Sequence, residues 1–564
     1  MLMLYLTTPA AIAEVSVSGV KGQARDNVLL MLSLEKEACD APEWKIRSLY
    51  AQADQEIDQA LRALGYYHAT VEKSLDFKRD CWQAGFDIRP GPRATVGAID
   101  ITVKGDARDD AEFQKLRADL PLKVGDPVHH GHYESLKRRF ESLALERGYL
   151  NAAFTESKLL IDKERNSARV ELVFDAGKRM YFGEVTVKQD ILNPDFVEKY
   201  IAIKQGEYYA TEKLAETHNA LSQSDYFDSV EIIPDTEHIK QQRVPIAITL
   251  SAKSRHLYSF GVGFDTDIGP LANAVYKNRR LNRRGHFLTA NLDISPVLST
   301  ADVEYSIPLE DPAHDVFSFG GGLRYEDTDT FKSRKAALST RYKKRLDNGW
   351  RQTLYIDFSY EEFETETESG EALLLVPGAS WLRSVADSVV RPTKGYRTEF
   401  EVRGSYENPL SDVSFLQGRF SGVWMQPVPG GGKFIGRTDL GATLVDDLER
   451  LPASYRFYAG GINSIRGYDY KELAPRNRSG HVEGGRFLTV VSAEYEHPVL
   501  DDWGVAAFVD TGNAFNAGDI SLKTGVGLGV RWYSPVGPVR LDFGVPLNEA
   551  NSSFQIHFSA GTRL

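Results

Sequence analysis

Near its end the chain reads FLTVVSAEYEHPV at residues 487–499 and WGVAAFVDTGNAF at residues 503–515. Apolar and polar side chains alternate along both stretches, and this period of two is typical of β-strands whose two faces meet different surroundings. One face is apolar: Phe487, Val491, Ala493, Tyr495, Val505, Ala507 and Val509. The other face carries Ser492, Glu494, Glu496, Phe508, Asp510 and Gly512. We expect the first face to meet lipid and the second to line a water-filled interior.

The same alternation continues through residues 256–564, for example where Leu354, Ile356 and Phe358 are separated by Tyr355 and Asp357. We count about sixteen such segments of about ten residues, and an even number of this length is typical of a closed bacterial barrel. A soluble sandwich shows similar alternation, but a long continuous meander favours the barrel. We therefore predict a transmembrane β-barrel of about sixteen antiparallel strands, preceded by three α+β domains.

Composition is consistent with this class. Hydrophobic residues make up 42% of the 564 residues and the net charge is −12. No stretch approaches the roughly eighteen apolar residues of a membrane-spanning helix. The acidic balance argues against binding nucleic acid, because such proteins usually carry a basic face.

The first 255 residues contain a weak repeat with a period of about eighty residues. An aromatic turn recurs as ALGYYHATV at 63–71, ERGYLNAAF at 146–154 and SQSDYFDSV at 222–230. An amphipathic helix precedes the turn in the first two units, and its apolar stripe is expected to cover a small sheet. The stripes comprise Ile57, Ala60, Leu61 and Leu64, then Leu136, Phe140, Leu143 and, more weakly, Arg147. We place the three domains at residues 14–91, 92–177 and 178–255.

The N-terminal end indicates export. Residues 1–13 read MLMLYLTTPAAIA, a short apolar stretch that ends in small residues, and we interpret it as the remnant of a signal peptide. A frayed strand is the alternative. Cys39 and Cys81 are the two cysteines, and in an oxidising compartment one pair predicts one disulfide. Two unrelated buried thiols are the alternative.

One connection is longer than a simple link between two neighbouring strands requires. Between the strands near 433 and 486 lies a loop, placed at 446–485, that contains AGGINSIRGYDY at 459–470. Gly467 allows close backbone approach, and Arg466 in a confined lumen requires carboxylate partners. The inward-facing Glu494 and Asp510 are suitable partners. The alternative is that these carboxylates merely line a wet channel.

Three motifs in this order resemble the BamA/TamA superfamily of outer-membrane assembly and translocation proteins: the Arg466-Gly467-Tyr468 loop, the A-E-Y strand and the F-V-D-T-G strand. The resemblance implies N-terminal POTRA domains and a 16-stranded barrel. It also implies that Arg466 docks on a barrel wall formed by Asp510, Glu494, Phe508 and Gly512. Three repeats point to the TamA branch. This sequence departs from the family's pattern at two positions. Ile465 stands where many members have Val, and the last residue, Leu564, is a poor match to the family's C-terminal insertion signal.

The resemblance implies a protein of the bacterial outer membrane with its N-terminal domains in the periplasm. It implies an inner-membrane-anchored TamB-type partner that spans the periplasm. The implied role is the insertion of autotransporters and other outer-membrane proteins, or support of lipid transport to the outer membrane. A dedicated secretion pore of the two-partner type is the alternative. In either case we expect clients to pass the seam between the first and last strands.

The lateral gate is expected between two segments at this seam. They contribute Gly261, Gly263 and Phe264 on the first strand and Phe554, Phe558 and Gly561 on the last. Glycine in a strand packs nothing and weakens pairing. The alternative is that these glycines only relieve crowding at the closure.

We do not expect an enzyme. The sequence lacks a G-x-S-x-G elbow, an H-E-x-x-H motif and a P-loop, and no cofactor is implied. His129, His130 and His132 form the one histidine cluster. Metal binding there is the less favoured interpretation, so no metal site is predicted.

Overall fold

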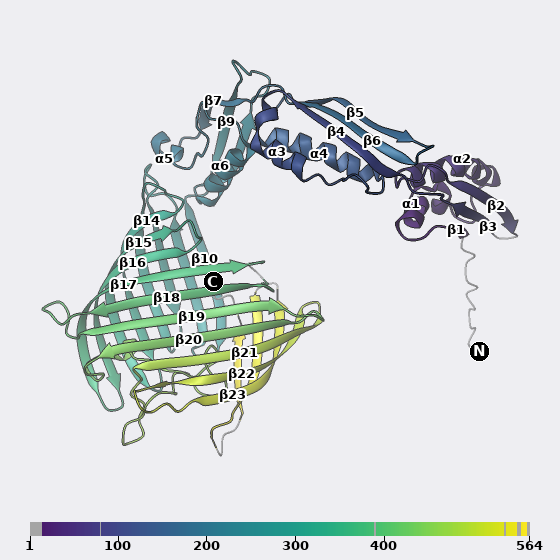
Figure 1. The fold of residues 1–564 in the computed structure, drawn as a ribbon. Coiled ribbons are helices and arrows are strands. Elements are labelled where there is room, and N and C mark those ends of the chain that lie inside the picture. The colour runs from purple at the N-terminus through teal and green to yellow at the C-terminus, as the bar shows by residue number, and fades with distance from the viewer. Residues whose placement is uncertain (1–13, 79–80, 389–390, 535–536, 550–553, 561–564) are drawn as a thin grey trace, which may run out of the picture. The chain divides into compact units, whose positions relative to one another are not determined.

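The computed structural model describes residues 14–78, 81–388, 391–534, 537–549 and 554–560 (Figure 1). The expected signal-peptide remnant, Gly561 and Leu564 lie outside these residues. The described residues form three small sheets and one closed barrel. Within them, no helix combines the length and apolar character that crossing a membrane requires.

The first domain is a three-stranded sheet in the order β1-β3-β2, with its helices packed on one face. Its elements are β1 Glu14–Ser18, α1 Gln23–Met31, α2 Glu43–Arg62, β2 Thr70–Lys78 and β3 Cys81–Arg89. The predicted stripe Ile57, Ala60 and Leu61 is fully buried against this sheet. A disulfide joins Cys39, ahead of α2, to Cys81 at the start of β3.

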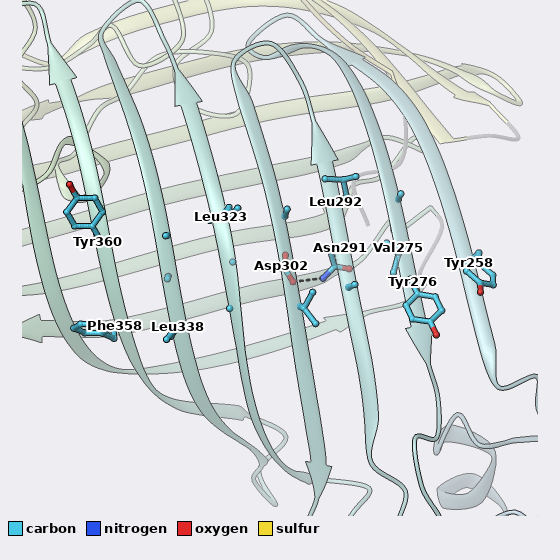
Figure 2. Close-up of a pocket in the computed structure, with 18 of the residues that line it drawn as sticks. Tyr258, Val275, Tyr276, Asn291, Leu292, Asp302, Leu323, Leu338, Phe358 and Tyr360 are labelled. Carbon is cyan, nitrogen blue, oxygen red and sulfur yellow. Dashed lines mark hydrogen bonds between the residues drawn. The ribbon is translucent and has the colours of Figure 1, made fainter.

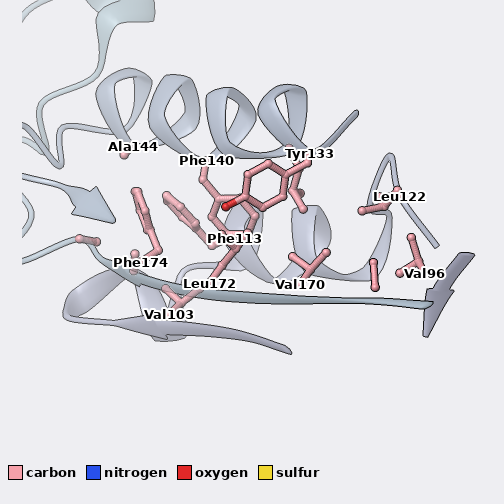
Figure 3. Packing of buried hydrophobic residues seen from close by; sticks show 14 of the residues in the cluster. Val96, Val103, Phe113, Leu122, Tyr133, Phe140, Ala144, Val170, Leu172 and Phe174 are labelled. Atoms are coloured by element: carbon pink, nitrogen blue, oxygen red, sulfur yellow. The ribbon is translucent and has the colours of Figure 1, made fainter. Parts of the chain in front are cut away.

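The second domain repeats this plan in the order β4-β6-β5. Its elements are β4 Thr95–Lys104, α3 Ala111–Ala118, α4 His130–Glu146, β5 Ala153–Asp162 and β6 Ser167–Asp175. Phe113, Phe140 and Phe174 meet in its core, with ring centroids 5.5–6.0 Å apart (Figure 3). Arg147 does not extend the apolar stripe, because its Nε donates to the buried Asp110 at 2.8 Å.

The third domain has the strand order β7-β9-β8. Its elements are β7 Tyr181–Lys188, α5 Pro194–Glu198, α6 Thr211–Gln223, β8 Phe227–Pro234 and β9 Arg243–Ala252. The chain divides into two compact units, and the division passes through this domain. Residues 188–201 and 218–231 belong to the same unit as the barrel.

Strands β10 to β25 form a closed sixteen-stranded antiparallel barrel in sequence order, which confirms the predicted fold class (Figure 1). The strands are β10 His256–Asp265, β11 Gly269–Asn278, β12 Phe287–Ile294, β13 Leu298–Pro308, β14 Asp315–Asp327, β15 Phe331–Arg345, β16 Arg351–Thr365, β17 Ser369–Ala386, β18 Gly395–Ser405, β19 Phe415–Pro427, β20 Lys433–Val445, β21 Phe487–Leu500, β22 Trp503–Phe515, β23 Lys523–Ser534, β24 Gly537–Pro546 and β25 Gln555–Ala560.

The two faces of the barrel wall follow the predicted alternation. On β21 and β22, Val491 and Val505 are 46% and 47% exposed, whereas Glu494 is 7% exposed and Asp510 is fully buried. The exposed face is apolar and the buried face is polar, because lipid meets one and the packed interior meets the other. The carboxylates therefore lie inside the barrel.

The seam that closes the barrel pairs Phe264 with Ala560 and Asp265 with Ser559 within the described residues. The backbone N–H of Thr266 also donates to the carbonyl of Phe558 at 2.9 Å. The ring centroids of Phe264 and Phe558 lie 5.9 Å apart, so both of these predicted gate residues are at the seam.

One expectation about the gate needs correction. Phe554 is not at the seam: it precedes β25, and its ring lies 6.3 Å from that of Phe543 on β24. The register that sets Ala560 beside Phe264 leaves Phe554 beyond the end of β10. On the β11 side of Gly261, a Cβ would lie 3.8 Å from the side chain of Asn273. Gly263 lies opposite Leu271 on β11.

Candidate functional site

The loop at 446–485 folds back into the barrel. Its short helix η3, Ala453–Tyr455, and much of the chain that follows are buried. Ile462 and Ile465 are fully buried and Tyr468 is 2% exposed. A loop this apolar is stable only against the inner wall, where Ile465 and Tyr468 pack with Leu488 and Val490 of β21.

Arg466 lies at the centre of this contact and is 1% exposed. Its Nε donates to Oδ2 of Asp510 at 2.7 Å and its Nη2 to Oδ1 at 3.0 Å, a bidentate pair. Its backbone N–H donates to the same carboxylate at 3.1 Å. Nη1 donates to Glu494 at 2.7 Å. The structure thus brings Arg466 together with both carboxylates that the sequence suggested.

Three further charged groups extend this contact. Asp542 on β24 accepts from Arg466 Nη1 at 3.3 Å. Arg531 on β23 donates to Asp542 at 2.6 Å and to Glu494 at 2.7 Å. Arg437 on β20 lies 3.7 Å from Asp510. We call the six groups the charge cluster; it comprises Arg437, Arg466, Arg531, Glu494, Asp510 and Asp542. Three charges of each sign offset one another, which a buried cluster requires.

Arg437, Arg531 and Asp542 were not predicted from the sequence as members of the cluster. The signal was present for Asp542, because alternation with Leu541 and Phe543 puts it on the inner face. Strand pairing supplies the rest: β23 and β24 follow β22 in the barrel wall, so their inner faces lie beside Asp510. Only the closed barrel shows that Arg466 reaches Asp542 and that Arg531 bridges Asp542 and Glu494.

Phe508 and Gly512 make different contributions. The Arg466 guanidinium lies 3.4 Å from the centroid of the Phe508 ring, a cation–π contact at a desolvated position. Gly512 instead permits a close strand approach, because a Cβ there would lie 2.0 Å from the carbonyl oxygen of Thr489 on β21. Phe508 is therefore part of the docking surface, and Gly512 shapes the wall beside it.

Gly467 and Tyr468 hold the loop backbone. Gly467 has φ of +94°, a conformation that favours glycine. Its N–H donates to Nε2 of His557 on β25 at 2.8 Å. The Tyr468 hydroxyl donates to the carbonyl of Thr524 at 3.4 Å. His557 was not anticipated from the sequence, although it alternates with Ile556 and Phe558.

Glycines on β23 and β24 make room for the loop. A Cβ at Gly525 would lie 1.9 Å from the carbonyl oxygen of Arg466, and one at Gly544 would lie 2.6 Å from the backbone nitrogen of Gly467. A Cβ at Gly527 would lie 2.4 Å from the Phe508 ring. Together these glycines form a slot in the inner wall, and the loop backbone lies in it.

Gly525→Ala is expected to displace the loop. The new methyl group meets backbone, which cannot move aside as a flexible side chain does, and overpacking of this kind typically costs about 1–3 kcal/mol. The measurement is the rate at which a protease cuts within 446–485. Gly418→Ala on β19 is the matched control, because a Cβ there has nothing within 4 Å. Equal cutting rates for the two variants would contradict a fitted slot.

Other contacts hold the two ends of the loop. Arg456, 5% exposed, donates to Glu368 at 3.0 Å and to the carbonyls of Leu451 and Glu483. Ser454 donates to the fully buried Glu361 at 2.6 Å. The loop is therefore fixed along its length and not only at Arg466.

The tip of the loop touches both sides of the seam. The N–H of Ile462 donates to the carboxylate of Asp267, in the turn after β10, at 2.9 Å. On the other side, Gly467 donates to His557, and Asp469 accepts from Gln555 at 2.7 Å, both on β25. These bonds join the first and last strands through the loop, in addition to their direct pairing.

A second charged group lies where the third domain meets the barrel. Asp225 accepts from Lys277 at 2.8 Å, from Arg279 at 3.0 Å and from Lys253 at 3.1 Å. Burial alone would raise the pKa of Asp225, but these three hydrogen bonds outweigh it and lower the pKa to about 2. Nearby, Tyr226 donates to the carbonyl of Gly285 in the turn after β11.

This lowered pKa predicts acid sensitivity of the junction. A carboxylate with a lowered pKa contributes its stability above its usual pKa of 3.8, and the contribution is lost as pH falls toward about 2. Hydrogen exchange of residues 218–231, corrected for the intrinsic pH effect, should rise over that interval. In Asp225→Asn it should be high already at pH 6 and nearly independent of pH. A flat profile in the unsubstituted protein would contradict the prediction.

The histidine cluster makes protein contacts. His130 lies 2.8 Å from the Tyr67 hydroxyl, and His129 lies 3.2 Å from Gln23. Among the described residues, no group of three or more His, Cys, Asp or Glu side chains is arranged to hold a metal ion.

Comparisons with known proteins agree with this architecture. Residues 284–564 match the Omp85 superfamily domain, residues 14–90 match TamA POTRA domain 1, and residues 180–253 match the POTRA family described as surface antigen variable number repeat. The outer membrane protein assembly factor BamA of Nitratidesulfovibrio vulgaris is 26% identical over 518 residues, covering 87% of this chain. BamA of Neisseria meningitidis is 21% identical and covers 80% of this chain. The chain spans 64% of the length of each of these relatives.

A solved structure shares the fold. BamA from Haemophilus ducreyi, lacking POTRA domains 1–3, aligns with a TM-score of 0.68 and 17% identity, covering 83% of this chain and 99% of that one. The barrel, the order of the domains and the matching sequence families therefore all indicate the same family. The chain belongs to the Omp85 superfamily: it is an outer-membrane β-barrel protein with N-terminal POTRA domains in the periplasm.

Proposed function

We propose that this protein is a TamA-like assembly and translocation factor that inserts autotransporters and other outer-membrane proteins, or supports lipid transport to the outer membrane. It acts with a TamB-type partner anchored in the inner membrane. The match of residues 14–90 to TamA POTRA domain 1 supports the TamA branch. The relatives named as BamA assembly factors support the general role.

One observation carries the mechanism: the loop that the charge cluster holds is hydrogen-bonded on both sides of the seam, to Asp267 after β10 and to His557 on β25. The seam is closed by direct pairing of Phe264 with Ala560 and of Asp265 with Ser559 among the described residues. Opening it also requires the loop tip to leave Asp267 or His557. The loop thus sets how readily the seam opens toward the membrane.

The periplasmic domains are the proposed partner sites. Each three-stranded sheet has two edge strands, and an edge accepts an added strand by backbone hydrogen bonds. In the first domain the edges are β1 and β2. We assign the TamB-type partner to this domain, since it lies farthest along the chain from the barrel. Its exposed Trp44, 73% accessible, is an additional apolar contact point.

The function is tested by reconstitution. The full chain is inserted into phospholipid vesicles, an unfolded autotransporter barrel is added, and its folding is followed by heat-modifiable gel migration. The proposal expects faster client folding than in empty vesicles, and Arg466→Ala vesicles should lose most of that acceleration. If client folding is equal with and without the protein, while a secreted passenger still crosses the vesicle wall, the two-partner secretion alternative replaces the assembly role.

A further inference from the structure

The outer wall of the barrel carries an apolar trough beside the seam. It has a volume of ≈ 810 Å³ and lies across strands β10 to β16. Figure 2 shows Tyr276, Leu292, Leu323, Leu338 and Tyr360 on neighbouring strands around it. These side chains point away from the interior, since Tyr360 alternates with Ser359 and Glu361, which are buried inside. We call this hollow the trough.

The trough arises from an alternation of large and small residues across the strands. Consecutive register partners from β10 to β16 are Phe260, Ala274, Leu292, Ala301, Leu323, Ala336 and Tyr360. Large residues stand on every second strand and alanines lie between them. The alanines leave space at the level of the wall, while Leu292 and Leu323 project beside it, 41% and 64% exposed.

The trough continues toward a charged rim. A second hollow of ≈ 420 Å³ shares Leu292, Leu323 and Tyr360 with it and adds Arg334 and Glu362. A third, of ≈ 400 Å³, shares Arg334 and Glu362 and adds Lys332. β14 ends and β15 begins at this rim, at the end of the barrel opposite the connection to the periplasmic domains. The series of hollows is therefore apolar at one end and charged at the other.

We propose that the trough binds one acyl chain of an outer-membrane lipid, with the lipid's polar head at the Arg334 rim. The protein lies in the outer membrane, so the occupant of an outward apolar hollow is hydrocarbon. Between protein and lipid there is no hydrophobic driving force, and preference comes from van der Waals packing. A trough walled by Leu292, Leu323 and Leu338 packs a chain on both sides, which a smooth wall does not.

The trough lies against the first strand of the seam, so a lipid bound in it would contact that strand. Tyr258 and Phe260 of β10 form the trough's edge, and Phe260 is 80% exposed. A chain in the trough therefore packs against the outer face of the first seam strand. This inference rests on the membrane location and not on the proposed assembly role.

The test uses the full chain in vesicles of phosphatidylethanolamine and phosphatidylglycerol that contain a phosphatidylethanolamine with a photoactivatable diazirine in its acyl chain. After illumination, labelled peptides are quantified by mass spectrometry. The proposal expects severalfold more label on β12 to β15 than on the outward residues of β21 to β23. In Ala301→Leu/Ala336→Leu, which fills the trough, that enrichment should be lost.

The matched control is Ala507→Leu, on the outward face of β22, which should leave the enrichment unchanged. Heat-modifiable migration shows that each variant is folded. Ala290→Leu serves as a second filling variant if the double variant does not fold. Even labelling around the barrel, or unchanged enrichment in a folded filling variant, would overturn the proposal. Loss of the label on addition of an unfolded client would overturn it too, since the trough would then be a binding site for the client and not for lipid.

Discussion

Arg466→Ala should release the loop from the barrel wall and abolish most client assembly. The substitution removes four side-chain hydrogen bonds to Asp510, Glu494 and Asp542, while alanine keeps the backbone bond to Asp510. Removing one partner of a buried charged group typically costs about 3–5 kcal/mol. We expect a cost near the lower end of this range, because Arg531 and Arg437 still neutralise the carboxylates. Protease cutting within 446–485 measures the release.

Two controls separate this effect from a general loss of charge. Arg478→Ala removes an exposed arginine from the same loop and should behave as the unsubstituted protein. Arg466→Lys keeps the charge but not the bidentate geometry, so it should restore the activity only in part. If Arg466→Ala and Arg478→Ala were equally resistant to protease and equally active, the loop would not depend on the charge cluster.

Removing the disulfide should destabilise the first domain by about 4 kcal/mol in the chain-entropy model. The bond joins residues 42 positions apart, so its loss frees a long loop in the unfolded chain. A domain of this size has a small core, and 4 kcal/mol is a large part of its stability. In Cys39→Ser/Cys81→Ser, the urea concentration at which residues 14–91 become sensitive to protease should fall.

A reducing agent supplies the matched control. It should shift the unsubstituted protein to the urea midpoint of the double variant and leave the double variant unchanged. The barrel, which contains neither cysteine, should keep its heat-modifiable migration throughout. An unchanged midpoint in the double variant would mean that helix and sheet packing, including the buried Trp82, holds the domain without the bond.

The sequence predicted the barrel because alternation is a local property. The alternation within a single strand shows which residues lie on each face, so Val505 is assigned to the outer face and Asp510 to the inner face without knowledge of the neighbouring strands. The disulfide and the Arg466 partners follow by similar reasoning from small numbers of candidates. The repeat of aromatic turns predicted three sheets with their helices, although Arg147 shows that the apolar stripe ends before the turn.

The remaining features depend on register between strands, which no local pattern contains. Phe554 was placed at the seam because the last strand was aligned by residue type, whereas the barrel's stagger sets Ser559 and Ala560 there. Asp542 reaches Arg466, and Arg531 bridges Asp542 and Glu494, only because β23 and β24 follow β22 in the barrel wall. The trough depends on register too. The sequence predicted which residues point outward, but only the observed register shows that large residues stand beside alanines across seven neighbouring strands.

The most direct test of the account is a crosslink across the seam. Cysteines replace Phe264 and Ala560, which lie opposite each other, while the native disulfide keeps Cys39 and Cys81 out of the reaction. Leu416 and Leu444, opposite each other on β19 and β20, give the control pair away from the seam and from the trough. We expect that oxidising the seam pair stops client folding in vesicles, that reduction restores it, and that the control pair has no effect. Full activity with a verified seam crosslink would contradict it and show that clients do not pass between the first and last strands.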